Sequence, residues 1–257
     1  MRLIGQGAMS RVYLAERVAT NETVVLKLLD GTLANDEESI QRLIREASLV
    51  SGIKSPYVVK IFEQGFTNKY GFIAMEFFAK GDMKQRLEQG LSIKAAFIHF
   101  LHLMRGLDVV HKAGIVHRDL KPANIMFRTN DELAIADFGI SKRMDATTQL
   151  TQVGSLLGTP AYMSPEQISA QPADHRADLY SAGVILHEML VGRRPFIADS
   201  FTGIAMQHLN SPLPPLPEEA KAFESIYQRL LAKEPEDRYQ SAEQVVNTLM
   251  TMIKRRI

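Results

Sequence analysis

The apolar pattern of the chain changes near residue 76, and this change limits the fold more than any other feature. Before it, short runs rich in Val, Ile, Leu and Tyr alternate with Gly, Asn, Thr and Asp, as in β-strands joined by turns. We expect strands in "SRVYLAE", "ETVVLKLLD", "VVKIFEQGF" and "GFIAMEFF". One helix interrupts them, because the apolar residues of "EESIQRLIREASLV" follow the spacing of an amphipathic helix.

Beyond this point the pattern becomes helical. Residues 92–113 carry apolar side chains at helical spacing and are followed by Gly114, which predicts a long amphipathic helix that ends there. The segment "DLYSAGVILHEMLVG" is apolar on nearly all sides, so we expect this helix to lie inside the protein. The chain of 257 residues is therefore expected to form a small sheet-rich lobe in residues 1–75, a hinge in 76–81 and a larger helical lobe in 82–257.

The composition argues against several classes of protein. Thirty Lys and Arg residues against 29 Asp and Glu residues leave a formal net charge of +1, which argues against a nucleic-acid binder with a broad basic surface. The absence of cysteine excludes disulfides, thiolate catalysis and Cys-ligated zinc. No apolar run reaches the ~18 residues of a membrane-spanning helix. We expect a cytoplasmic domain, with which a membrane anchor after residue 257 would be compatible.

The segment "GQGAMSRV", residues 5–12, joins two expected strands, and its glycines would let backbone amides approach a phosphate closely. A simple hairpin turn is the alternative, whereas a dinucleotide-binding loop would be followed by a helix. Lys27 ends the strand "VVLK", and a buried lysine needs an anionic partner. Glu46 on the amphipathic helix could supply it, although each residue taken alone is most simply exposed.

The segment "HRDLKPAN", residues 117–124, gathers charged and amide side chains directly after the long helix. Asp137 follows in "LAIADFG". An amide oxygen from Asn124 and a carboxylate from Asp137 suit Mg²⁺, which takes few protein ligands, and Asp119 then remains for an incoming hydroxyl group. A charged surface loop is the alternative, but it does not predict the other motifs in this order.

Taken in order, "GQGAMSRV", "VVLK", Glu46, "HRDLKPAN", "DFG" and "GTPAYMSPEQ" resemble the motifs of the eukaryotic-type protein kinase family over practically the whole chain. Lys121 and Thr159 resemble the serine/threonine branch, and "HRDLKPANI" and "AYMSPEQ" are similar to its bacterial, Hanks-type members. The resemblance implies an α+β, bilobal fold. A small antiparallel sheet lobe with one main helix would precede a larger helical lobe, with ATP bound between the two.

The resemblance also implies an ATP site. Lys27, paired with Glu46, would hold the α and β phosphates, and Asn124 and Asp137 would hold Mg²⁺, or alternatively Mn²⁺. The adenine would lie against the hinge beside Met75 as the gatekeeper. The residues implied in ATP binding are Ile4, Gly5, Gln6, Gly7, Ala8, Met9, Ser10, Val12, Val25, Lys27, Met75, Glu76, Phe78 and Met126.

Two of these residues depart from the family pattern. Ser10 stands where a third glycine is usual, and Val25 stands where alanine is usual, which adds bulk above the adenine. We expect these departures to change affinity or inhibitor choice and not to abolish activity. For catalysis, the resemblance implies that Asp119 orients a Ser or Thr hydroxyl and accepts its proton, while Lys121 neutralises the transferring γ-phosphoryl group.

Other residues are implied in architecture. Asp178 would anchor the 117–124 loop from the buried helix, and Arg238 would pair with Glu166. The side chains expected to stack as a regulatory spine between the lobes are Val50, Ile61, His117 and Phe138.

A regulatory site is implied in "DATTQLTQVGSLLGTP", residues 145–160. Arg118, directly before Asp119, would receive a phosphate in this segment, because phosphate brings about −1.5 to −2 charge and strong acceptor oxygens. Thr151 is the expected main site, and Thr147 and Thr148 are secondary. Thr159 would instead pack near Asp119. A flexible polar loop without regulation is the alternative.

The expected partners are proteins that offer Ser or Thr hydroxyls, together with phosphothreonine-reading (forkhead-associated) domain proteins and a second copy of the chain during autophosphorylation. Nucleic acid is not expected. The expected activity is that of an ATP-dependent serine/threonine kinase. A pseudokinase scaffold is the alternative, disfavoured because Lys27, Asp119, Asn124 and Asp137 are all present. A small-molecule phosphotransferase is disfavoured by "GTPAYMSPE", which in the family shapes a groove for a peptide.

Overall fold

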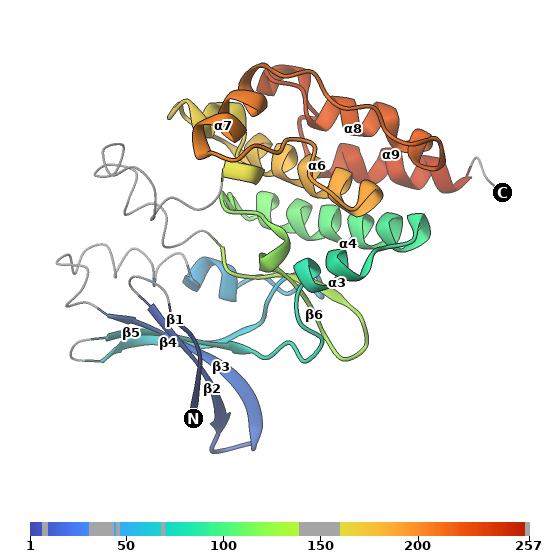
Figure 1. The fold of residues 1–257 in the computed structure, drawn as a ribbon. Helices are drawn as coiled ribbons and strands as arrows, with labels where there is room; N and C mark the ends of the chain where they lie inside the picture. The colour runs from blue at the N-terminus through green and yellow to red at the C-terminus, as the bar shows by residue number, and fades with distance from the viewer. Residues whose placement is uncertain (7–9, 31–43, 45–46, 68–69, 139–159, 255–257) are drawn as a thin grey trace.

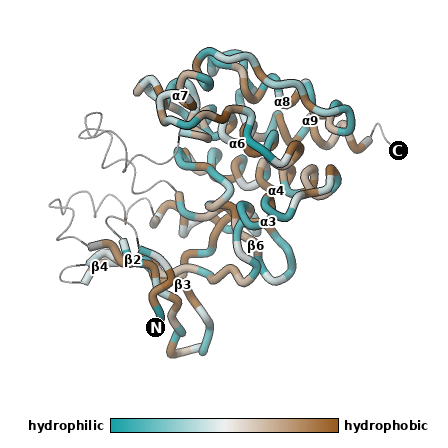
Figure 2. The backbone as a smooth tube through the Cα atoms, viewed as in Figure 1, coloured by the Kyte–Doolittle hydropathy of each residue, from teal (hydrophilic) through white to brown (hydrophobic). Residues whose placement is uncertain are grey.

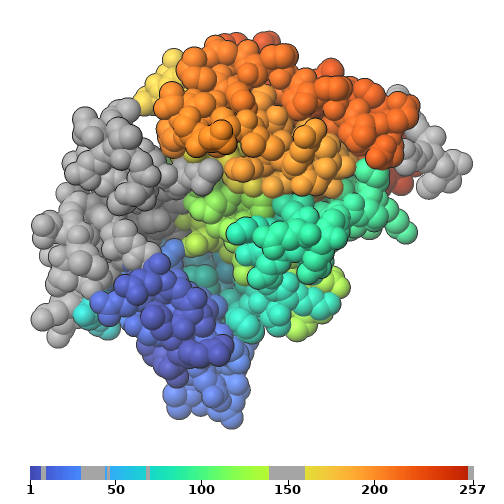
Figure 3. Space-filling view, viewed as in Figure 1, coloured from blue at the N-terminus to red at the C-terminus, as the bar shows by residue number. Residues whose placement is uncertain are grey.

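The structure of the protein is a computed structural model, and it describes residues 1–6, 10–30, 44, 47–67, 70–138 and 160–254. An antiparallel sheet lies at the N-terminal end of the molecule and a helical part at the other end (Figure 1). In the space-filling view the N-terminal strands form one end of the molecular surface and the last helices form the opposite end (Figure 3). The expected α+β, bilobal arrangement is confirmed.

Five strands form the sheet in the order β1-β2-β3-β5-β4, and all neighbours are antiparallel. Their bounds are β1 Arg2–Gln6, β2 Ser10–Arg17, β3 Glu22–Asp30, β4 Ile61–Thr67 and β5 Tyr70–Glu76. The strands expected in "SRVYLAE", "ETVVLKLLD" and "GFIAMEFF" are found. The run "VVKIFEQGF" becomes a strand only from Ile61, because Val58 instead bridges Ile135 of the helical part.

The helical part contains a two-stranded ladder and helices on either side of it in sequence. The ladder is β6 Ile125–Phe127 with β7 Leu133–Ile135, and the α-helices are α3 Met83–Gln89, α4 Ile93–Lys112, α5 Pro165–Ile168, α6 His175–Val191, α7 Phe201–Asn210, α8 Glu224–Leu230 and α9 Ala242–Lys254. Short 3₁₀ turns lie at Pro122–Asn124, Pro160–Tyr162, Glu218–Phe223 and Pro235–Asp237. None of the helices in the described ranges is long and apolar enough to cross a membrane.

Helix α4 begins and ends where its sequence predicts. The side chain of Ser92 caps its first turn by accepting a hydrogen bond from the backbone N–H of Ala95 (3.2 Å). His111 and Lys112 occupy its last turn, where positive charge is favourable. Gly114 has a φ of 75°, a left-handed conformation that glycine adopts without strain. One face of the helix is buried in the core.

Helix α6 lies at the centre of the helical part. Its side chains from Ala177 to His187 are all buried, as expected from a helix that is apolar on nearly every side. Gly192, with a φ of 76°, ends it. Along the chain, apolar and polar segments alternate (Figure 2), and the apolar ones from α4, α6, α8 and the β6–β7 ladder share one core cluster.

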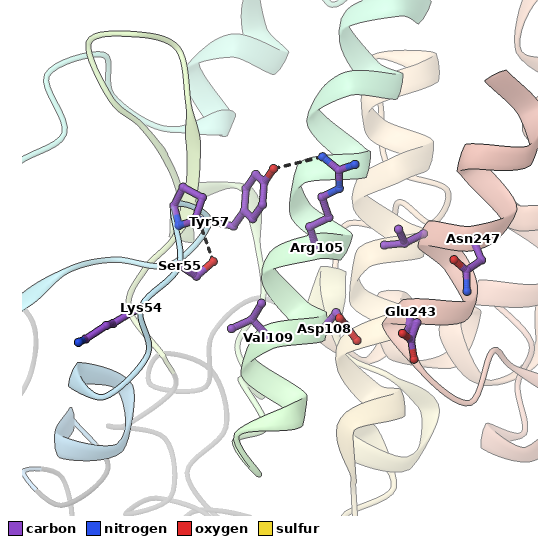
Figure 4. Close-up of a pocket in the computed structure, with 10 residues that line it drawn as sticks. Lys54, Ser55, Tyr57, Arg105, Asp108, Val109, Glu243 and Asn247 are labelled. Carbon is purple, nitrogen blue, oxygen red and sulfur yellow. Dashed lines mark hydrogen bonds between the residues drawn. The ribbon is translucent and has the colours of Figure 1, made fainter. Parts of the chain in front are cut away.

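Residues 54–59, before β4, attach the sheet to the helical part. The N–H of Ile135 on β7 donates a hydrogen bond to the Tyr57 carbonyl, and the N–H of Val59 donates one to the Ile135 carbonyl, both at 2.9 Å. The Tyr57 hydroxyl accepts a hydrogen bond from Arg105 of α4 at 3.2 Å (Figure 4). A pocket of about 380 Å³ lies here between α4, α9 and this segment. It shares no lining residue with the 117–124 loop.

Gly106 of α4 allows this close approach. A Cβ at this position would lie 2.8 Å from Ile135 Cδ1 and 2.9 Å from the Tyr57 carbonyl oxygen. We predict that Gly106→Ala lowers the free energy of unfolding by about 1–3 kcal/mol, because overpacking outweighs the ~1 kcal/mol that alanine gains over glycine in a helix. Urea denaturation measures the difference.

Gly52→Ala is the matched control, because its added Cβ would meet only the Leu49 carbonyl oxygen at 3.4 Å. This control should leave stability nearly unchanged. A Gly106→Ala protein as stable as the wild type would contradict the packing argument.

Candidate active site

The 117–124 loop is held by one buried carboxylate, that of Asp178 on α6. Asp178 Oδ2 accepts hydrogen bonds from the His117 N–H and from His111 Nε2, and Oδ1 accepts one from the Arg118 N–H, each at 2.8 Å. Burial acts to raise the pKa of Asp178, but its contacts with His111 and His117 outweigh burial and leave the pKa below its ordinary value. The expected anchoring role of Asp178 is confirmed.

The His117 ring supports the loop from inside. Its Nδ1 accepts the Asp119 backbone N–H at 3.3 Å, so the proton lies on Nε2, which donates to the Ala136 carbonyl at 3.1 Å. The ring also packs against Phe138, with 4.9 Å between ring centroids. One fully buried imidazole therefore links Asp119 to the segment that carries Asp137.

Asp119, Lys121 and Asn124 lie together in this loop. Lys121 Nζ is 2.8 Å from Asp119 Oδ2. Asn124 Nδ2 donates to the Asp119 carbonyl at 2.8 Å and approaches the Asp137 carbonyl at 3.5 Å. Because its Nδ2 faces two carbonyl oxygens, Oδ1 is the Asn124 side-chain atom that can act as an acceptor or metal ligand. The loop thus gathers a carboxylate, an ammonium group and an amide oxygen.

Asp137 joins the loop to the sheet. Lys27 Nζ of β3 lies 2.5 Å from Asp137 Oδ1, and the Asp137 side chain is 53% exposed. Nearby protein atoms act to raise the pKa of Asp137 by desolvation, but the charge and hydrogen bond of Lys27 outweigh this and keep it below its ordinary value. Asp137 has a φ of 54°, an uncommon conformation for a residue with a Cβ.

The four residues expected to stack between the lobes lie in one apolar region. Val50 and Phe138 are buried members of the main core cluster, and Ile61 packs against the same cluster. His117 contacts Phe138 through its ring. Because Val50 and Ile61 come from the N-terminal part and the other two from the helical part, this packing connects the sheet to the 117–124 loop.

The expected hinge begins at Glu76, the last residue of β5, and Glu76 has a partner that the sequence did not indicate. Arg128, just after β6, bonds the Glu76 carboxylate through Nε (2.8 Å) and Nη2 (2.7 Å). It also bonds the carbonyls of Pro56 and Val58. Glu76 further accepts the Lys60 N–H at 2.7 Å. Its side chain is therefore occupied by protein contacts and holds the hinge in place.

The other expected ATP-binding residues that are described lie on the strands around this point. Val25 pairs in register with Met75, and Val12 pairs with Lys27. Gly5 on β1 pairs with Val12. The remaining ones are Ile4 and Gln6 on β1, Ser10 at the start of β2, Phe78 after β5 and Met126 on β6.

Several predictions concern residues outside the described ranges. These are the Glu46 partner of Lys27, the loop residues Gly7, Ala8 and Met9, and the regulatory threonines Thr147, Thr148, Thr151 and Thr159.

The end of the "GTPAYMSPEQ" segment is held against the helical core. Ser181 of α6 donates to the Tyr162 carbonyl at 2.6 Å, and the Tyr162 hydroxyl donates to Glu188 at 2.7 Å. Glu166 of α5 forms a two-point ion pair with the fully buried Arg238, at 2.7 and 2.8 Å. The expected Arg238–Glu166 pair is confirmed.

Comparison with known proteins agrees with this geometry. The family model described as "Protein kinase domain" matches residues 1–250. The chain is 38% identical over 270 residues to "Serine/threonine-protein kinase pkn3" of Myxococcus xanthus, covering 99% of this chain and 49% of that protein. It is 34% identical over 266 residues to "Probable serine/threonine-protein kinase PknB" of Bifidobacterium longum, covering 97% and 39%. Against "Serine/threonine-protein kinase PknH" of Mycobacterium tuberculosis the identity is 36% over 249 residues, covering 94% and 39%. The chain thus spans less than half the length of these relatives.

Because Asp178 alone holds two successive N–H groups of the loop, its charge should matter to stability. We predict that Asp178→Asn lowers the free energy of unfolding by about 3 kcal/mol at pH 7, since the amide offers one acceptor in place of two and turns an NH₂ group toward donors. The folded-state pKa of Asp178 is depressed, so its contribution is present above the ordinary aspartate pKa of ~3.9 and is lost as pH falls below it. Urea denaturation at several pH values should show the two proteins converging at acid pH.

Asp108→Asn is the control, because the Asp108 carboxylate is part-exposed and pairs with the exposed Lys112. Its effect should stay below ~1 kcal/mol. Equal losses in the two variants would contradict the anchoring role of Asp178.

Proposed function

Because the chain belongs to the protein kinase family, we propose that it transfers the γ-phosphoryl group of ATP to serine and threonine hydroxyls of proteins in a Mg²⁺-dependent reaction. One observation carries the proposal. Lys27 of the sheet pairs with Asp137, while Asp119, Lys121 and Asn124 converge on the same place from the 117–124 loop. The serine/threonine preference is supported by the names of the similar bacterial kinases.

The donor atoms of the site fit Mg²⁺ and a triphosphate. The half-exposed Asp137 carboxylate and the Asn124 amide oxygen are hard oxygen ligands, of the kind and small number that Mg²⁺ takes beside phosphates and water. Lys27 offers an ammonium group for phosphate oxygens. Bound Mg²⁺ would neutralise charge on the β and γ phosphates. Mn²⁺ could replace it, because it accepts the same ligands.

The hinge suits the adenine. Among the hydrogen bonds between described residues, none uses the backbone N–H of Phe78, so this donor is available to a ligand. Met75 and Val25 lie in register on neighbouring strands and would set the size of the space for the base. Arg128 keeps the Glu76 side chain engaged, so we assign adenine binding to the backbone of the hinge.

In the transfer step, Asp119 accepts a hydrogen bond from the substrate hydroxyl and takes its proton. The hydroxyl oxygen bonds to the γ-phosphorus while the bond to the β–γ bridging oxygen breaks, and ADP leaves. The ammonium group of Lys121 lies 2.8 Å from Asp119. Its positive charge would neutralise the γ-phosphoryl group during transfer. Positioning and electrostatic stabilisation are the main contributions of a protein to such a reaction.

By family resemblance we extend the proposal to partners and location. The substrates are proteins with Ser or Thr hydroxyls, phosphothreonine-reading forkhead-associated domain proteins are binding partners, and two copies of the chain meet during autophosphorylation. The domain acts in the cytoplasm.

The first test is Asp119→Asn. The amide keeps the shape of the side chain but cannot take the proton, so we expect transfer to fall by ~10² to 10⁴ with folding and ATP binding unchanged. Purified protein, radiolabelled ATP and a generic protein substrate measure the rate, and fluorescence titration measures nucleotide affinity. An Asp119→Asn protein that labels substrate at the wild-type rate would disprove the assignment, and a wild type that binds ATP without transfer would favour a pseudokinase.

A second test concerns regulation. We propose that Thr151 is autophosphorylated and that Arg118 binds the phosphate, because a charge-assisted, two-point contact of this kind orders a segment. Mass spectrometry should find phosphate on Thr151 of active protein, and Thr151→Ala and Arg118→Ala should each reduce activity. An unmodified Thr151 in fully active protein would rule the proposal out, as would two variants with unchanged activity.

A further inference from the structure

Gln167 of α5 contacts the residue directly before Asp119. Its Nε2 donates a hydrogen bond of 2.9 Å to the Arg118 carbonyl oxygen. The other end of the amide, Oε1, accepts the Ser164 N–H at 3.1 Å. Because Oε1 faces an N–H and Nε2 faces a carbonyl, these partners determine the orientation of the amide.

The contact acts on the peptide bond that carries Asp119. The C=O of Arg118 and the N–H of Asp119 belong to one planar peptide group. Gln167 holds the oxygen of this group, and His117 Nδ1 holds its N–H at 3.3 Å. The plane from which the Asp119 side chain projects is therefore fixed on both sides, by α5 on one and by the 117–124 loop itself on the other.

The backbone at this point needs such support. Arg118 has a φ of 64°, in the left-handed region where a residue with a Cβ is strained. Its N–H is held by Asp178 of α6 and its C=O by Gln167 of α5. Two elements from different parts of the sequence thus keep Arg118 in a conformation that an unconstrained chain would seldom adopt.

Helix α5 is itself held in place by side-chain contacts. Its N-terminus is closed by a reciprocal capping arrangement between Ser164 and Gln167. Glu166 of the same helix is paired with the buried Arg238. Gln167 therefore projects from a short helix that is anchored at two points, the Ser164–Gln167 cap and the Glu166–Arg238 ion pair.

We propose that Gln167 is a positioning residue of the phosphoryl-transfer reaction, which it serves by holding the Arg118–Asp119 peptide plane. The inference rests on the proposed function and deepens it. It links the segment that ends "GTPAYMSPEQ" directly to the residue assigned as proton acceptor. Gln167 touches neither ATP nor the hydroxyl in this scheme, so it acts through Asp119 alone.

Gln167→Glu tests the proposal, because a carboxylate keeps the acceptor for Ser164 but loses the donor to Arg118. We expect kcat to fall about 10- to 100-fold, the scale on which small misplacement of a reacting group lowers a rate. KM for ATP and the melting temperature should stay close to the wild type. If Gln167 had a purely structural role, Gln167→Glu would lower the melting temperature and would not lower kcat selectively while KM for ATP stayed unchanged.

Gln207→Glu is the matched control. The Gln207 amide also accepts one N–H and donates to one carbonyl, both of Ile197, at 2.9 and 3.0 Å. It makes the same kind of contact far along the chain from Asp119, so its kcat should not change. Gln167→Met, which lacks charge, serves if Gln167→Glu does not fold, and it should show the same fall in kcat.

An Asp119→Asn background gives a second readout. If Gln167 acts through Asp119, adding Gln167→Glu to Asp119→Asn should reduce the residual rate by less than twofold. Full additivity of the two substitutions would overturn the inference, as would an unchanged kcat in both Gln167 variants or an equal fall in Gln207→Glu. A wild-type protein that transfers no phosphoryl group would overturn the proposed function itself, and the inference with it, whereas active wild type with active Gln167 variants would overturn the inference alone.

Discussion

The candidate site depends on the hydrogen bonds that the buried Asp178 carboxylate accepts from the 117–124 loop. A charge with 1% exposure is costly to bury unless hydrogen-bond donors surround it. Three donors do so here, and two of them are successive backbone N–H groups of His117 and Arg118. Helix α6 is packed on nearly all sides, so the core fixes its position. The hydrogen bonds of Asp178 then hold the loop that carries Asp119 against this helix.

A second set of contacts attaches the N-terminal sheet to the helical part. The segment before β4 is bonded to β7 at Tyr57 and Val59, and Arg128 ties Pro56, Val58 and Glu76 together. The Lys27–Asp137 ion pair is a further contact between the sheet and the helical part. Backbone hydrogen bonds and apolar packing thus join the sheet to the helical part, and the Lys27–Asp137 ion pair is one of several contacts across this junction.

Much of the fold and of the site could be predicted from local patterns. The strands β2, β3 and β5 and the helices α4 and α6 have the periodicities that their sequences show, because burial of one face or of all faces imposes that spacing. The sequence predicts that the fourth strand begins at Val58, but β4 begins at Ile61, since Val58 forms a bridge to Ile135 outside the sheet. Arg128 and Gln167 were missed, because their partners Glu76 and Arg118 lie 52 and 49 residues away and no local pattern marks such pairs.

The sequence by itself determined which segments become strands or helices, where α4 and α6 end, and the order in which Lys27, Asp119, Asn124 and Asp137 occur. The strands, the helices and the helix ends depend on neighbouring residues, through periodicity, capping and glycine conformation. Only the tertiary structure decided that Lys27 meets Asp137 across 110 residues and that Gln167 holds the Arg118 carbonyl. Contacts of this kind depend on how whole helices and strands pack against one another. That packing is determined by core residues from many parts of the chain, so no short stretch of sequence predicts it.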